Sequence, residues 1–160
     1  MEYKISDTDN LEEIWNMNVS SHPGDERWVK WKEEYIRYNI TGLAKTFVVV
    51  IDGKTVGEGT LLFSSSCRAV NGNIFLADGK NVANVNALRI IKKYEGMGHI
   101  SRLMKMMESY AKDMGFTRLT IGVSRDNERN VSIYKHRGYD RLILSEYDDG
   151  EWVDYYEKNI

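Results

Sequence analysis

The stretch from Val82 to Val123 constrains the fold most, because its periodicity changes twice. A β-like run over 82–91 leads into a segment with helical spacing, and a second β-like run follows over 118–123. The apolar stripe of the middle segment consists of Ile100, Leu103, Met104, Met107, Ala111 and Met114. A strand, a helix and a strand in this order predict a parallel, right-handed crossover, and therefore an α/β fold.

The other segments complete a mixed α/β domain. A short strand and two amphipathic helices, over 9–22 and 25–39, precede a β-rich region with a hairpin signal at Asp52-Gly53. A short helix over 127–138 precedes a second hairpin. We expect a mixed sheet of about six or seven strands flanked by about four helices. Nothing marks a linker in the 160 residues, so the sequence predicts one domain over 1–160.

Composition excludes several classes of function. A net charge of −2 gives no reason to expect a nucleic-acid partner. Cys67 is the only cysteine and the three histidines share no ligand spacing, so neither a disulfide nor a metal site is expected. No apolar run is long enough for a membrane span and the first residues lack a leader pattern, which predicts a cytoplasmic protein. A homodimer is left open.

Two glycines, Gly96 and Gly98, stand between the β-like run and the helix. They are compatible with a tight turn from strand to helix. They are equally compatible with an anion site, because the N–H groups at a helix start attract negative charge and glycine lets a phosphate approach. The dinucleotide pattern G-x-G-x-x-G fails because its third glycine is replaced by Ser101, and no P-loop occurs.

Two motifs in this half of the chain resemble those of the GNAT superfamily of N-acetyltransferases. The first comprises Leu88-Arg89-Ile90, Tyr94, Gly96-Met97-Gly98 and Leu103, and the second comprises Asn127, Tyr134, Gly138 and Tyr139. The sequence departs from the family pattern at three positions. Glu95 replaces an Arg or Gln, Ile100 replaces a Gly or Ala, and Asn130 replaces a small residue.

The resemblance implies an acyltransferase that uses acetyl-CoA, with a cofactor-binding core over about 82–139. Acetyl-CoA would lie between the strand ending near Ile90 and the strand over 118–123. The residues implied to hold its diphosphate are Glu95, Gly96, Met97, Gly98, His99, Ile100 and Ser101. The backbone of Leu88, Arg89 and Ile90 would pair with the pantetheine.

The resemblance also assigns roles near the second motif. Tyr134 would protonate the leaving thiolate, although its spacing alone favours a buried core tyrosine. Asn127 would contact the cofactor and also cap its helix. Family members often carry a glutamate base on the Leu-x-Val strand, which here has no carboxylate. Glu58 on the preceding strand is a candidate base, and the alternative is an exposed strand glutamate.

The acceptor side is expected in the segments 1–40 and 140–160. Their aromatic and acidic residues are Asp25, Glu26, Trp28, Trp31, Asp148, Asp149, Glu151 and Trp152. Such groups suit a small cationic amine, such as a polyamine or an aminoglycoside, or a lysine side chain of a protein. Alternatively, the tryptophans are core residues and the acids a solvated turn. Two other functions stay open: an acyl-CoA-binding or protein-interaction module without turnover, and a nucleotide-binding module.

Overall fold

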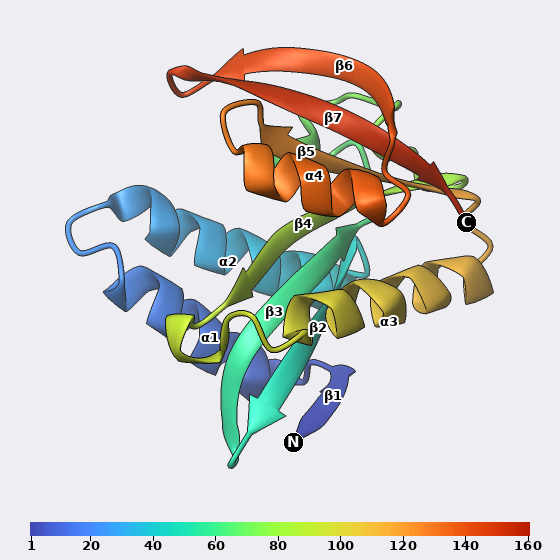
Figure 1. The fold of residues 1–160 in the computed structure, drawn as a ribbon. Coiled ribbons are helices and arrows are strands. Elements are labelled where there is room, and N and C mark those ends of the chain that lie inside the picture. The colour runs from blue at the N-terminus through green and yellow to red at the C-terminus, as the bar shows by residue number, and fades with distance from the viewer. The chain divides into compact units, whose positions relative to one another are not determined.

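The computed structural model describes residues 1–160 and consists of helices and strands in the predicted order (Figure 1). The strands are β1 (Glu2–Ile5), β2 (Ala44–Ile51), β3 (Lys54–Leu62), β4 (Val82–Ile90), β5 (Arg118–Ser124), β6 (Arg141–Asp148) and β7 (Glu151–Asn159). The helices are α1 (Thr8–Ser20), α2 (Glu26–Thr41), α3 (His99–Asp113) and α4 (Glu128–His136). Two 3₁₀ turns, η1 (Arg68–Val70) and η2 (Lys92–Tyr94), flank β4.

The strands form one mixed seven-stranded sheet in the order β1-β2-β3-β4-β5-β7-β6. Val82–Val85 of β4 pair in parallel with Arg118–Ile121 of β5, with α3 between them in the chain. The pairs β1–β2, β5–β7 and β6–β7 are antiparallel. The predicted parallel unit and the predicted mixed sheet are both confirmed.

The chain packs as two compact units, which are described separately. The first unit comprises Met1–Leu61 and Ala87–Met107, and the second comprises Leu62–Asn86 and Glu108–Ile160. The strand β4 and the helix α3 each contribute residues to both units. The prediction of a single domain over 1–160 stays a prediction.

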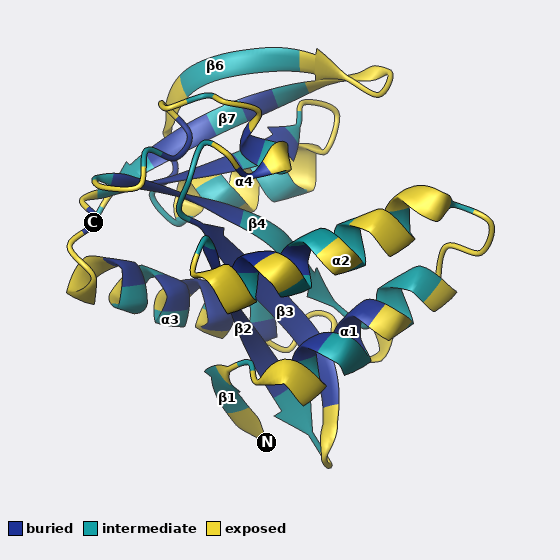
Figure 2. Cartoon of the chain, turned by 180° about the vertical axis from the view of Figure 1, so that it is seen from behind, coloured by how far each residue is buried: buried dark blue, intermediate teal, exposed yellow.

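In the first unit, α1 and α2 lie side by side (Figure 1). The Asp7 side chain accepts from the Asn10 backbone N–H at 2.8 Å and caps α1, and Asp25 caps α2. The inner helical positions are buried: Leu11, Ile14, Trp15, Tyr35 and Tyr38. They cover the sheet on the side where β2 and β3 are buried along most of their length (Figure 2).

The helix α3 presents its predicted stripe to the core. Leu103, Met104 and Met107 are buried, as is Ala111 further along. The predicted extent of the stripe was wrong at one position. Met114 is 59% exposed, because the helix ends at Asp113 and the chain turns at Gly115. No helix of the chain has the length and apolar character needed to span a membrane.

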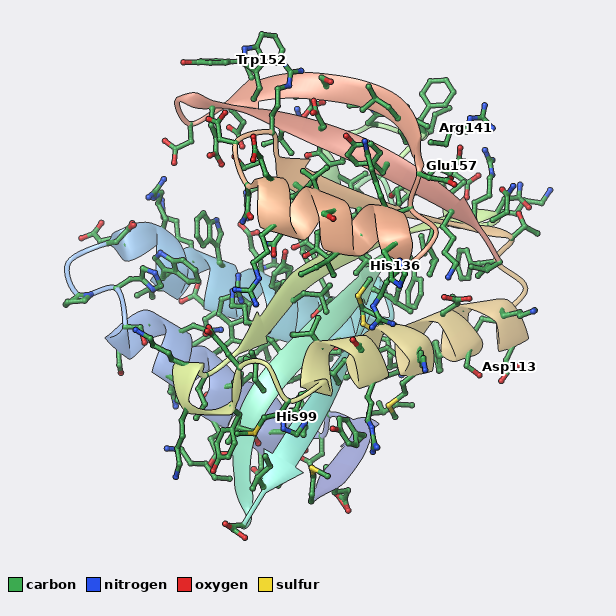
Figure 3. The ribbon with its side chains drawn as sticks, in the orientation of Figure 1. His99, Asp113, His136, Arg141, Trp152 and Glu157 are labelled. Atoms are coloured by element: carbon green, nitrogen blue, oxygen red, sulfur yellow. The ribbon has the colours of Figure 1, made fainter.

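The second unit is built on the hairpin of β6 and β7. Asp149 and Gly150 both have positive φ, 48° and 83°, and form the predicted turn. Two acidic residues of β7, Asp154 and Glu157, are buried and paired with arginines. Figure 3 labels Glu157 beside Arg141, whose Nε lies 3.6 Å from the Glu157 carboxylate. These ion pairs stabilise carboxylates that burial would otherwise disfavour.

Candidate functional site

The two glycines of the first motif form the turn that opens α3. Gly96 has φ +74° and Gly98 has φ +85°, a region in which a side chain is strained. An added Cβ would meet nothing within 4 Å at either glycine, so space beside this backbone is open. The N–H of Arg102 donates to the Gly98 carbonyl at 3.1 Å, which starts the helix. A helix start of this kind presents backbone N–H groups toward the space before it, as an anion site requires.

The side chains of this loop have different surroundings. Glu95 and Met97 are exposed, and Ile100 is half-buried in line with the core stripe. His99 is buried at the beginning of α3 (Figure 3). Its Nδ1 lies 2.5 Å from the Tyr3 hydroxyl, so a hydrogen bond ties β1 to the start of α3. His99 thus has a structural role, and its predicted backbone contact with acetyl-CoA stays a prediction.

The strand β4 changes conformation just before Leu88. Ala87 has φ +53°, which is uncommon for a residue other than glycine. The parallel register of β4 with β5 ends two residues earlier, at Val85 and Ile121. Strained backbone of this kind is concentrated at functional sites, where the surrounding structure maintains it. The sequence held no signal for it, because alanine has no preference for positive φ.

Glu58 on β3 is fully buried, so the alternative of an exposed strand glutamate is wrong. Its Oε2 accepts from Asn18 Nδ2 at 2.7 Å and from an Arg89 guanidinium N–H at 3.2 Å. Its Oε1 has no partner. Burial raises the pKa of the Glu58 carboxyl above its ordinary value, while Arg89 and Asn18 act in the opposite direction. The carboxylate is therefore buried, only partly paired and electrostatically unusual.

The Arg89 side chain was not predicted to have a role, since the resemblance implied only its backbone. Its guanidinium carbon lies 5.3 Å from the centre of the Trp15 ring and 5.0 Å from that of Trp28. Both distances fit cation–π contacts. His22 stacks on the outer partner, Trp28, at 3.8 Å between ring centres. An arginine inside a largely apolar strand was the one available signal in the sequence.

A pocket of about 180 Å³ adjoins this cluster within the first unit. Its lining residues are Ile14, Met17, Asn18, Ser21, His22, Val56, Arg89, Ile90 and Ile91. Most of the walls are aliphatic, and no carboxylate lines them. Asn18 and Arg89 both line the pocket and hydrogen-bond to Glu58. The carboxylate therefore lies directly behind two of the polar lining residues.

The second unit contains Asn127 and Tyr134. The Asn127 side chain accepts from the Asn130 N–H at 3.1 Å, which confirms its role as a helix cap. Tyr134 is half-buried in α4, and burial raises the pKa of its phenol. The phenol is thus protonated at neutral pH and able to donate a proton. Neither the predicted cofactor contact of Asn127 nor the acid role of Tyr134 is tested by this geometry.

Several acidic and aromatic residues of the acceptor-side segments have structural partners. Asp25 pairs with Arg27 at 2.8 Å, and Trp152 lies against Tyr147 and under the Arg125 guanidinium. Glu151 accepts from the Ser124 hydroxyl at 2.9 Å. No group of three or more histidine, cysteine, aspartate or glutamate side chains is arranged to hold a metal ion.

A family model described as the acetyltransferase (GNAT) family matches residues 9–139. Among solved structures, an N-acetyltransferase from Staphylococcus aureus Mu50 is 13% identical at a TM-score of 0.73, covering 99% of this chain and 97% of that one. A spermidine N-acetyltransferase from Vibrio cholerae is 15% identical at a TM-score of 0.70, with 99% and 95% covered. An aminoglycoside 6′-N-acetyltransferase complexed with coenzyme A is 11% identical at 0.70, with 99% and 97% covered. No curated protein sequence matches the chain.

Proposed function

The chain belongs to the GNAT acetyltransferase family, and on this basis we propose that it moves an acetyl group from acetyl-CoA to the primary amine of a small cationic molecule. The single observation that carries the proposal is the turn at Gly96 and Gly98, which opens α3 toward free space. A similar solved structure, the aminoglycoside acetyltransferase, contains coenzyme A.

We assign the diphosphate of acetyl-CoA to the backbone of residues 96–101, because the Glu95 N–H already donates to the Lys92 carbonyl at 3.1 Å. A helix start presents N–H groups toward an anion, and the helix dipole favours negative charge there. The exposed Glu95 opposes this binding only from a side chain in solvent, where charge is screened. Leu88, Arg89 and Ile90 follow Ala87, where the backbone is distorted, and their side chains are half-buried. We assign to their backbone the added-strand pairing implied for the pantetheine.

In the proposed reaction the neutral amine attacks the thioester carbonyl, and the C–S bond breaks after the C–N bond has formed. A backbone N–H of β4 stabilises the charge that develops on the carbonyl oxygen. Tyr134 gives its phenolic proton to the leaving thiolate, the attacking nitrogen loses one proton to solvent water, and the tyrosinate takes a proton back from solvent, so that free coenzyme A and the N-acetylated amine result. Burial raises the pKa of the Tyr134 phenol, so the phenol still holds its proton when the thiolate leaves, and it is also a weaker acid than an exposed tyrosine.

Replacing Tyr134 with Phe tests this assignment. We expect kcat to fall roughly 100-fold, the lower end of general acid catalysis, with the KM for acetyl-CoA nearly unchanged. The matched control is Tyr147→Phe, which removes an exposed hydroxyl of the same unit. Equal kcat values for the two variants would contradict the role of Tyr134. Absence of acceptor-dependent coenzyme A release in the unmutated protein would contradict the proposed function itself.

A cationic acceptor fits the first unit better than an anionic one. The pocket near Glu58 has aliphatic walls that suit methylene chains, and a buried carboxylate lies behind them. Similar solved structures include enzymes named for spermidine and for an aminoglycoside. Coenzyme A release across a panel of amines tests this, and turnover only with neutral or acidic amino acids would overturn it. A cytoplasmic location stays a prediction, and a homodimer is still left open.

A further inference from the structure

Glu58 carries a polar group that the folded chain leaves unsatisfied. Its Oε1 has no hydrogen-bond partner although the residue is fully buried, and the Nε1 of the adjoining, fully buried Trp15 also has none. A buried polar group without a partner destabilises the folded state, because its hydrogen bonds to water are lost and not replaced. Such groups are rare in native proteins and each requires an explanation. Two of the residues that line the neighbouring pocket, Asn18 and Arg89, are the hydrogen-bond partners of Glu58, so a ligand in that pocket could account for the unsatisfied oxygen.

The position that a ligand cation would take is now filled by the chain itself. The Arg89 guanidinium lies against Trp15 and Trp28 and donates one hydrogen bond, of 3.2 Å, to Glu58 Oε2. Its side chain is 33% exposed, whereas that of Glu58 is completely buried. Arg89 therefore covers Glu58 from the solvent side with a single polar contact.

We propose that Trp15, Trp28 and Glu58 form a binding site for a cationic group of the acceptor, and that Arg89 occupies this site until the acceptor displaces it. We refer to these three residues as the cation site. The inference rests on the proposed function for the identity of its ligand, an alkyl ammonium or guanidinium of the acceptor. It does not rest on acetyl transfer, because the binding can be measured without acetyl-CoA.

The exchange of one cation for another leaves the charge of the site unchanged. A free, buried carboxylate would be costly, so Arg89 stabilises the state without ligand. An incoming ammonium has three N–H donors and can reach Oε1 as well as Oε2, which the single Arg89 hydrogen bond does not. The aliphatic walls, formed by Ile14, Met17, Val56, Ile90 and Ile91, cover the methylenes of such a ligand.

The first experiment measures binding. Arg89→Ala removes the part of the side chain that N-ethylguanidinium replaces, so this ion is the probe, and N-ethylurea is its neutral control. We expect N-ethylguanidinium to raise the Tm of Arg89→Ala, with a Kd at least tenfold lower than for the unmutated protein. N-ethylurea should not do so, and the double variant Arg89→Ala/Glu58→Gln should lose the effect. Equal affinity for Arg89→Ala and the unmutated protein would overturn the proposal.

The second experiment measures kinetics with spermidine as acceptor. Removing a competitor increases the fraction of protein that is competent to bind, so Arg89→Ala should lower the KM for spermidine at least fivefold. Glu58→Gln should raise it at least tenfold. Arg89→Met, which keeps much of the aliphatic packing, replaces Arg89→Ala if that variant does not fold. A rise in KM on removing Arg89 would overturn the proposal, because Arg89 would then be a permanent contact of the ligand.

Matched controls come from the second unit. Glu157 is also a buried glutamate, and Arg118 donates to it at 2.9 Å. Neither Glu157→Gln nor Arg118→Ala should change the KM for spermidine or the affinity for N-ethylguanidinium. If no amine is turned over while N-ethylguanidinium still binds Arg89→Ala, the proposed function fails and the cation site stands. If amines are turned over but this binding is absent, only the cation site fails.

Discussion

The two units each contain a buried carboxylate paired with an arginine, but the pairs differ in how completely they are satisfied. In the second unit, both oxygens of Asp154 accept from Arg125, at 2.9–3.3 Å, and Oδ1 also accepts from the Ser145 hydroxyl at 2.6 Å. In the first unit, Glu58 receives hydrogen bonds at one oxygen only. Burial is common to both and therefore does not distinguish a structural carboxylate from a functional one.

The pKa directions follow from this difference. The hydrogen bonds from Arg125 lower the pKa of Asp154, with Ser145 acting in the same direction. Burial raises the pKa of Glu58 despite Arg89. Asp154 therefore stabilises the fold most as an anion, whereas Glu58 stabilises it more when neutral than when ionised and depends on Arg89 as its counter-ion in the ionised form. We therefore expect Glu58, which the fold leaves partly unsatisfied, to be the carboxylate available to a ligand.

Asp154→Ala should give the largest change in stability. It removes charge-assisted hydrogen bonds worth about 3 kcal/mol, and for a chain of this length the Tm should fall by roughly 6–12 °C. Thermal unfolding at pH 7 measures this, with Asp148→Ala, at the exposed end of β6, as control. The KM for spermidine should not change. A Tm equal to that of the control would show that the fully paired carboxylate is not the structural one.

Glu58→Gln should change the free energy of unfolding with a pH dependence opposite to that of Asp154→Ala. Because the folded-state pKa of Glu58 is raised, its contribution is present below the ordinary pKa and lost as pH rises through the raised value. The glutamine does not titrate, so the stability of the variant relative to the unmutated protein should increase between pH 4 and pH 8. The gain should be of the order of 1 kcal/mol for each pH unit by which the folded-state pKa of Glu58 exceeds its ordinary value.

Chemical denaturation across this pH range measures the difference. Asp154→Ala provides the contrast, since a lowered pKa means that the unmutated protein loses the Asp154 contribution as pH falls. The difference in stability between Asp154→Ala and the unmutated protein should therefore become smaller toward low pH. Parallel pH profiles for the two variants would remove the distinction between the carboxylates.

Trp28→Leu should give the smallest effect. It compares the cation–π contact at Trp28 in the first unit with the one at Trp152 in the second. Loss of one ring of the cation site costs about 0.5–1 kcal/mol, so the KM for spermidine should rise about two- to fivefold. Trp152→Leu is the matched control, because Arg125 lies 5.1 Å from the Trp152 ring centre in the second unit. Acceptor titrations at saturating acetyl-CoA measure both. Equal shifts in KM would count against a specific role for Trp28.

The sequence by itself determined the features that depend on neighbouring residues. The helix α3 and the turn at Gly96 and Gly98 follow from spacing and from the φ angles that glycine permits. The cap by Asn127 is likewise local, since its side chain accepts from a backbone N–H three residues on. These short-range rules were sufficient for the order of elements and for the family motifs.

Only the tertiary structure decided the surroundings of Glu58. Its partners Asn18 and Arg89 are 40 and 31 residues away in the chain, and Trp15 and Trp28 come from two different helices. A strand residue's burial depends on what packs over its face, which no local period specifies. The same limit explains Met114, whose helical spacing continued after the helix itself had ended.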